Sequence, residues 1–220
     1  SGSLDAGLPW SPSALYSRLE ALSEGIVSLG NVKTVQGVYV PLNASSTINL
    51  TTIEALTYSL IDINRAADFG LMVNATGTTF NVNGHSVNLS LLSQVAGTNI
   101  YVSGSVETVL PSVRSLLNDQ GHMAWQVSGA GSILRFPNLT TIENTTSIER
   151  RVFIRAEGGG RLDMPLVSSM NAASGGNSSI EVRASGAGSR IDLPELRSFI
   201  DVSSGSLDAG LPWSPSALYS

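Results

Sequence analysis

The sequence predicts an all-β fold wound as a β-solenoid, with one short α-helix in each 203-residue unit, and three observations carry this prediction. Proline recurs at a near-constant interval, at Pro111, Pro137, Pro165 and Pro194. The apolar residues around each proline keep the same positions. Residues 1–17 return unchanged as residues 204–220. Successive coils of a solenoid must keep one apolar register, because equivalent side chains stack above one another in the core.

The identical ends predict a tandem array. The segment SGSLDAGLPWSPSALYS occupies both 1–17 and 204–220 of the 220 residues. We therefore expect residues 1–203 to form one repeat unit and residues 204–220 to begin the next identical unit, as in a window onto a longer polymer. The alternative is a discrete protein with overlapping ends.

The helix is expected over about residues 12–24. Ser11 is a good N-cap, and Pro12 stands at the first helical position, where its missing N–H costs nothing. Gly25 offers a stop. Apolar residues follow at helical spacing at Leu15, Leu19, Leu22 and Ile26.

The solenoid coils are expected over about residues 32–203. The residues before each proline alternate between apolar and polar, as in a strand, and glycine-rich turns precede them. Equivalent apolar residues lie three positions and one position before successive prolines. These form the expected core ladder: Leu134, Phe136, Leu162, Met164, Ile191 and Leu193. We expect Ile191→Asp to unfold the C-terminal coils, because it buries an unpaired charge.

The coil pattern also crosses the boundary between units. Ile200 and Val202 match Ile180 and Val182 in this alignment, and Leu207 matches Ile191. Successive units are therefore expected to share one continuous core. The expected junction residues are Ile200, Val202, Leu207 and Trp213.

The run GAGSRIDLPEL at 186–196 resembles the right-handed β-helix repeats of very large bacterial surface and secreted proteins. The resemblance covers residues from about 100 to 202. It implies a right-handed parallel β-helix and a fibrous, stalk-like or adhesive role outside the cell. It implies no catalytic residues.

Composition narrows the classes of function. The chain has no cysteine, which excludes disulfides and thiolate metal sites within this stretch. Twelve basic residues against seventeen acidic ones, with a single lysine, argue against nucleic-acid binding. No apolar run reaches the length of a membrane span, and no cofactor motif is present. His85 and His122 lie in turn-like segments that predict no metal site or nucleophile.

Arginines concentrate in the last third of the chain, and two of them are candidates for binding. Arg155 and Arg183 are expected to stack one coil apart, which makes a basic strip able to bind an acidic polysaccharide. The alternatives are lateral docking on a neighbouring fibre and a solvated, self-compensating surface.

Carboxylates also recur, at Asp163, Asp192 and Asp208, with Asp5 as the equivalent in the first copy. Such a ladder is able to hold Ca²⁺ or to serve a polysaccharide lyase. Arg135 stands at the equivalent position of the preceding coil, which favours a solvated surface instead. We therefore expect no metal site.

Seven sequons for N-glycosylation occur, at Asn43, Asn49, Asn74, Asn88, Asn138, Asn144 and Asn177. Asn49, Asn74 and Asn88 alternate with apolar residues and are expected to point outward.

Together these features predict a structural repeat unit of a long extracellular fibre, stalk or cell-surface protein. Its main partner is expected to be itself, end to end and also laterally, and an extracellular polysaccharide is a second partner. We expect no enzyme activity. The alternatives are an adhesin or binding module for acidic polysaccharides and a β-helix polysaccharide lyase or hydrolase.

Overall fold

The computed structural model describes residues 16–45, 47–145, 151–172 and 178–202. All regular structure in this part of the chain is β, from β1 to β22, and it contains no helix. Every strand pairing within these ranges is parallel. The prediction of an all-β chain is confirmed, and long parallel sheets of this kind are compatible with a β-solenoid.

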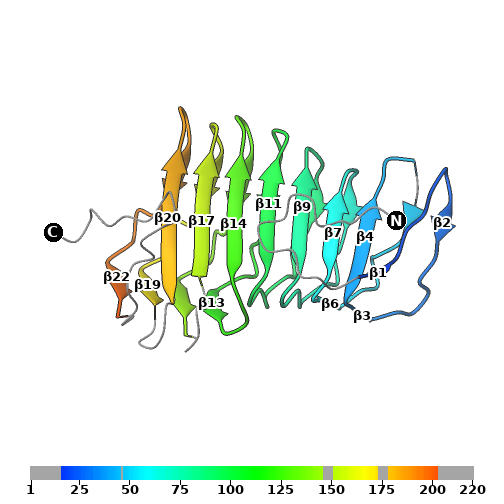
Figure 1. The fold of residues 1–220 in the computed structure, drawn as a ribbon, viewed down its shortest axis with the longest axis horizontal. Helices are drawn as coiled ribbons and strands as arrows, with labels where there is room; N and C mark the ends of the chain where they lie inside the picture. Colours follow the sequence, from blue (N-terminus) through cyan, green and yellow to red (C-terminus); the bar gives the residue numbers. More distant parts are fainter. Residues whose placement is uncertain (1–15, 46, 146–150, 173–177, 203–220) are drawn as a thin grey trace.

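The largest sheet in the described part of the chain has eight strands, and we call it the main sheet (Figure 1). Its strands follow one another in chain order, although one or two other strands intervene in the sequence between each strand and the next. In order across the sheet they are β1 (Ser17–Arg18), β4 (Val38–Leu42), β7 (Leu60–Ile63), β9 (Thr79–Asn83), β11 (Asn99–Ser103), β14 (Met123–Ser128), β17 (Arg151–Glu157) and β20 (Ser179–Ser185). We call the stretch from one main-sheet strand to the next a rung.

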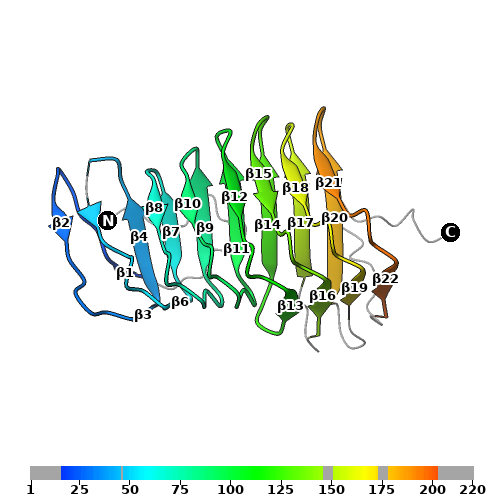
Figure 2. The ribbon, with the colours of Figure 1, turned by 180° about the vertical axis from the view of Figure 1, so that it is seen from behind.

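The remaining strands form smaller parallel sheets beside the main sheet (Figure 2). One four-stranded sheet contains β12 (Glu107–Val109), β15 (Ile133–Arg135), β18 (Arg161–Asp163) and β21 (Arg190–Asp192). Another contains β13 (Ser115–Asn118), β16 (Thr141–Asn144), β19 (Ser169–Ala172) and β22 (Ser198–Asp201). Three two-stranded sheets pair β2 (Ile26–Val27) with β5 (Thr47–Ile48), β3 (Thr34–Gln36) with β6 (Ala55–Thr57), and β8 (Ala67–Asp68) with β10 (Val87–Asn88).

The rungs lengthen along the chain while the main sheet keeps its register. Ile61 pairs with Phe80 in an early rung, whereas Ile154 pairs with the more distant Val182 in a late one. The extra residues are accommodated away from the main sheet, where β15 and β16, of three and four residues, take the place of two-residue strands such as β8 and β10 and of isolated bridges such as Asn74–Gln94.

The prolines mark a β-turn that recurs along the stack. The N–H of Val167 donates to the carbonyl of Met164 at 3.3 Å, which places Pro165 at the second turn position. Proline suits this position because its fixed φ matches the turn. The same turn joins Met72 to Phe69 without proline, which explains why the repeat is harder to read in the first hundred residues.

The core consists of inward-facing apolar columns that run from rung to rung. Leu134 pairs with Leu162, and Leu162 pairs with Ile191. Leu134, Leu162, Phe136 and Met164 are fully buried, whereas Ile191 and Leu193 in the last described rung are only partly buried. The side chains of the core ladder therefore share one interior, and its exposed end lies at the last described rung.

The expected helix over 12–24 is wrong for residues 16–24; residues 12–15 lie outside the described part. Ser17–Arg18 is a strand paired with Val38–Tyr39. Ser23 and Glu24 have positive φ values of 49° and 67°, which no right-handed helix contains. The helical spacing of apolar residues was misleading because Leu22 and Ile26 are 61% and 76% exposed. Backbone pairing with β4 outweighed the local helix signals.

The alignment of Ile200 with Ile180 is also wrong. Ile200 lies in β22 and pairs with Asn171, whereas Ile180 lies in the main sheet. Both segments alternate with period two, and a pattern of that kind does not reveal which sheet a strand joins. Ile200 and Val202 are 48% and 54% exposed. Leu207 and Trp213 lie outside the described residues.

Candidate functional site: an arginine–aspartate ladder

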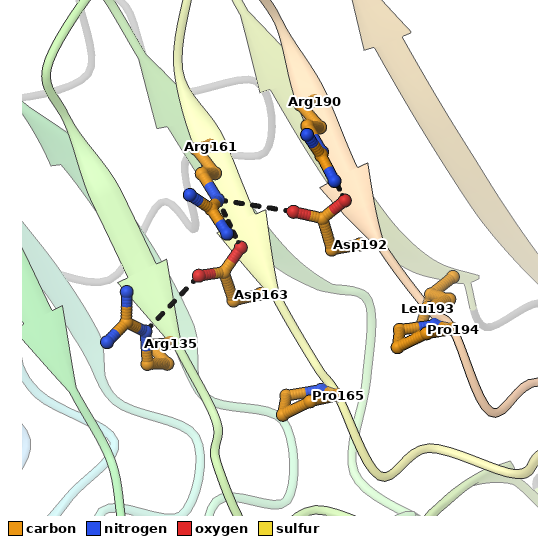
Figure 3. A pocket seen from close by; sticks show the side chains of 8 residues that line it. All are labelled: Arg135, Arg161, Asp163, Pro165, Arg190, Asp192, Leu193 and Pro194. Atoms are coloured by element: carbon orange, nitrogen blue, oxygen red, sulfur yellow. Dashed lines mark hydrogen bonds and ion pairs between the residues drawn. The ribbon is translucent and has the colours of Figure 1, made fainter.

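One group of charged side chains lies on the sheet of β15, β18 and β21. Leu162 at the centre of β18 points into the core, so Arg161 and Asp163 on either side of it both point outward. In β21, Arg190 and Asp192 flank Ile191 in the same way. Figure 3 shows the resulting rows of alternating arginine and aspartate side chains.

Ion pairs join these side chains into one continuous series, which we call the Arg–Asp ladder. Its pairs are Arg135–Glu107 (3.1 Å), Arg135–Asp163 (3.2 Å), Arg161–Asp163 (2.6 Å), Arg161–Asp192 (3.2 Å) and Arg190–Asp192. Three arginines face three carboxylates, so the ladder is electrically balanced. Its members come from four neighbouring strands, β12 to β21.

The members of the Arg–Asp ladder differ in burial, and Asp163 is the most buried of them. The Asp163 side chain is 8% exposed, whereas those of Arg135 and Arg161 are 39% and 45% exposed. The hydrogen bond to Asp163 raises the pKa of Arg161. Burial opposes ionisation of Asp192, but the hydrogen bond from Arg190 and the neighbouring positive charges outweigh it and lower the pKa of Asp192. The stability from this shift is present above the ordinary carboxyl pKa of 3.8 and is lost as the pH falls below it.

A shallow depression of about 670 Å³ lies over the ladder. The ladder side chains and Pro165, Leu193 and Pro194 line it (Figure 3). Both carboxylate oxygens of Asp163 are engaged, one by Arg135 and the other by Arg161. A cation or a substrate hydroxyl would have to displace these guanidinium groups. The arrangement is suited to holding successive rungs together rather than to acid–base chemistry.

The two arginines of the expected basic strip lie side by side but differ in their surroundings. Arg155 pairs with Arg183 across β17 and β20. The Arg155 guanidinium lies 4.3 Å from the Phe153 ring centroid, and its Nε donates to Glu181 at 2.7 Å. Arg183 is exposed and has no ion pair within the described ranges. Of these two arginines, Arg183 is therefore the one that offers an uncompensated positive charge.

The sequons occupy very different environments. Asn49 and Asn88 are exposed, and Asn43, Asn74 and Asn138 are partly buried. Asn144 is fully buried, and its Nδ2 donates to the carbonyl of Ser179. Its amide nitrogen therefore has no room for a glycan in this fold. Asn177 lies outside the described residues.

Among the described residues, no group of three or more His, Asp or Glu side chains is placed to hold a metal ion. The described residues likewise contain no helix long and apolar enough to cross a membrane. Comparison with protein-family models, with curated proteins and with solved structures found no match to this chain.

Sequence reasoning treated the arginines and the aspartates as two separate sets and missed the ladder that they form. The signal was present in the spacing Arg161-Leu162-Asp163 and Arg190-Ile191-Asp192, because residues two apart in a strand share a face. The cross-strand ion pairs depend on the register between rungs, which the structure supplies.

Neutralising the most buried member of the ladder should destabilise the fold. Asp163→Asn leaves Arg135 and Arg161 without their shared carboxylate, and we expect a loss of about 1–2 kcal/mol in the free energy of unfolding. Urea denaturation followed by circular dichroism measures this loss. The control is Glu195→Gln, whose partner Arg197 is 80% exposed, with an expected change below about 0.5 kcal/mol. Equal effects of the two variants would contradict a stabilising role for the ladder.

Proposed function

We propose that the chain forms a right-handed β-solenoid and serves as the structural unit of a long extracellular fibre, stalk or surface protein whose units stack end to end. The observation that carries the proposal is that apolar columns run from rung to rung and end on uncovered side chains. Met170 is fully buried in β19, whereas Phe199, paired with it in β22, is 53% exposed. An uncovered column of this kind is completed by a further rung.

The free edges of the main sheet support the same proposal. β1 and β20 are its terminal strands, and each pairs on one side only within the described ranges. An unpaired strand edge is a template for pairing with another chain. All the main-sheet strands run in the same direction, so a second copy shifted along the stack would present its β1 parallel to β20 (Figure 1).

The sequence repeat and the general geometry of β-sheets supply the remaining support. The identity of residues 1–17 and 204–220 fits units that follow one another in series. Connections between parallel strands of one sheet are right-handed in about 98% of cases, which favours the right-handed form. The extracellular location and the absence of enzyme activity are parts of this proposal and rest on the resemblance to surface-protein repeats.

Self-association of the 220-residue chain tests the proposal. Sedimentation velocity over a wide range of concentration, with negative-stain microscopy, is expected to show oligomers that grow in length only. A chain that stays monomeric up to millimolar concentration would contradict end-to-end stacking.

A matched pair of variants locates the association at the end of the stack. Phe199→Asp should abolish it, because Phe199 continues the inward column of Met170. Leu117→Asp should leave it unchanged: Leu117 is equally exposed, at 52%, but lies on the outward side of β13 in the middle of the stack.

Binding of an acidic polysaccharide is a second candidate, favoured by the exposed Arg183 beside Arg155. A guanidinium recognises a carboxylate through two parallel hydrogen bonds. Retention on a pectate column that falls with salt and is lost in the double variant Arg155→Ala, Arg183→Ala would support it. Retention that is unchanged in the double variant would exclude this strip.

A further inference from the structure

We propose that units stack in one defined register, in which β20 of one unit pairs in parallel with residues 18–21 of a second copy. This inference rests on the proposed end-to-end stacking and adds the partner strand, its alignment and the charges that select it. In this register Glu181 lies beside Arg18 of the second copy, and Arg183 lies beside its Glu20.

The alignment follows from columns that already cross the main sheet. The column of Arg18 runs through Tyr39, Leu60, Thr79, Asn99, Ala124 and Phe153 to Glu181. The column two residues later runs from Pro41 through Asp62, Asn81, Tyr101, Gln126 and Arg155 to Arg183. The N–H of Leu19 donates to the carbonyl of Tyr39 at 2.9 Å, which closes the Arg18–Tyr39 pair, and Pro41 has no N–H to continue the ladder. We place Glu20 in the second column by continuing the alternation of β1: Ala21 is buried, and Glu20 pairs with Arg18 two residues earlier. A second copy placed one rung beyond β20 continues each column with its own first residue.

The two ends match in polarity as well as in charge. Between the charged positions, Val182 meets Leu19 of the second copy, and both pack against the core. Ala184 meets Ala21, which is 4% exposed and therefore inward-facing in the first rung. Inward positions thus meet inward positions, and each outward position brings opposite charges together.

The charges also exclude the neighbouring registers. A slip of one residue would turn the inward side chains of one strand to the outside. A slip of two residues in one direction sets Arg183 beside Arg18, and in the other direction it sets Glu181 beside Glu20. Both of these put like charges opposite each other, which is destabilising. Among the registers within two residues of it, the proposed register alone satisfies the burial pattern and the charges together.

The two arginines of the proposed contact are exposed, whereas the side chains of Glu20 and Glu181 are 15% and 24% exposed. Arg183 is exposed and has no ion pair within the described ranges. The Arg18 side chain is 49% exposed and pairs with Glu20, two residues beyond it in the same chain. Stacking would place Arg155, Glu181 and Arg18 of the second copy in one alternating series. The contact joins two different surfaces, so it does not close on itself and produces a filament.

The rungs at the two ends of the described stack differ in length. Ser17 pairs with Val38 at one end of the stack and Arg151 pairs with Ser179 at the other, so the first rungs are shorter than the last ones. The other sheets therefore do not carry one alignment from end to end. The main sheet does, because every change in rung length is absorbed elsewhere.

Disulfide cross-linking tests the register directly, because the chain has no natural cysteine. A single chain carrying Glu20→Cys and Arg183→Cys should form disulfide-linked multimers under mild oxidation, seen as a ladder on a non-reducing gel. The two positions lie seven strand spacings apart in one molecule, roughly 34 Å at about 4.8 Å per strand, so no intramolecular disulfide competes. The control Arg18→Cys with Arg183→Cys is two residues out of register and should cross-link roughly tenfold more slowly.

Charge exchange provides a second, reversible test. The variant Arg18→Glu, Glu20→Arg and the variant Glu181→Arg, Arg183→Glu each keep the net charge of the chain. Each should associate roughly tenfold more weakly than the unaltered chain. An equimolar mixture of the two variants should regain assembly. Where the altered strand of one variant meets the altered strand of the other, positive and negative side chains again face each other.

The outcomes separate this inference from the proposed function. Assembly of the unaltered chain with no effect of either exchange, or with cross-linking equal to the control, would overturn the register and leave end-to-end stacking intact. Failure of the unaltered chain to associate at all would overturn both. Cross-linking in the proposed register together with rescue in the mixture would establish the contact.

Discussion

Replacement of Leu162 by aspartate is expected to abolish cooperative folding of the rungs from β15 to β21. Leu162 is fully buried, with Leu134 on one side and Ile191 on the other side of it in the core ladder. The Arg–Asp ladder lies on the opposite face of β18, so no arginine of the ladder reaches the inward position. A buried carboxylate without a partner costs several kcal/mol even when it becomes protonated, and we expect a loss above about 4 kcal/mol.

Urea denaturation followed by far-ultraviolet circular dichroism measures this loss. The comparison variant is Ile191→Asp, at the next position of the same column. Ile191 is only partly buried because it lies in the last described rung, so its substitution should cost about 1–3 kcal/mol. This is a smaller effect than the sequence alone suggested. A melting temperature of Leu162→Asp within a degree or two of the unaltered chain would contradict the core ladder.

The second large effect is expected for Phe136→Ala. The Phe136 ring stacks on that of Trp125 with centroids 4.2 Å apart and an interplanar angle of 25°, and both residues are fully buried. Removing the ring leaves a cavity that close-packed neighbours fill only in part. We expect a loss of about 3–5 kcal/mol in the free energy of unfolding.

Near-ultraviolet circular dichroism adds a local readout, since the signal of Trp125 depends on its stacking partner. The control is Trp125→Phe. The Trp125 Nε1 is buried and has no hydrogen-bond partner among the described residues, so phenylalanine removes an unsatisfied N–H while keeping an aromatic ring. We expect this control to cost less than half as much as Phe136→Ala. A cost below about 1 kcal/mol for Phe136→Ala would show that the stacked pair does not organise this rung.

These two substitutions probe the part of the molecule that the sequence described best. The apolar positions around Pro137, Pro165 and Pro194 predicted which side chains share a column, and the structure pairs those columns strand to strand. The prediction succeeds there because a parallel stack repeats one pattern at a near-constant interval. In the earlier rungs Ser90 and Thr51 stand where proline stands later, and the same turns form with a weaker sequence signal.

The Arg–Asp ladder shows where the sequence was insufficient. Each of β18 and β21 carries its arginine and aspartate two positions apart, which is visible in the sequence. Which aspartate meets which arginine depends on the alignment of β15, β18 and β21, whose paired residues lie a whole rung apart in the chain. The ion pairs that link the Arg–Asp ladder from strand to strand therefore form only when the rungs are stacked, and no single segment of the chain contains them all.

The sequence by itself determined the all-β class, the positions of the core ladder and the repeating turns, because those features depend on local alternation and on turn residues. The tertiary structure alone decided that Ser17 and Arg18 pair with β4 as a strand, that Ile200 joins β22, and that aspartates and arginines interleave. The physical reason is shared by all three. A parallel strand makes its hydrogen bonds with a partner one full rung away in the chain, and burial along that shared stack outweighs the preferences of a few neighbouring residues.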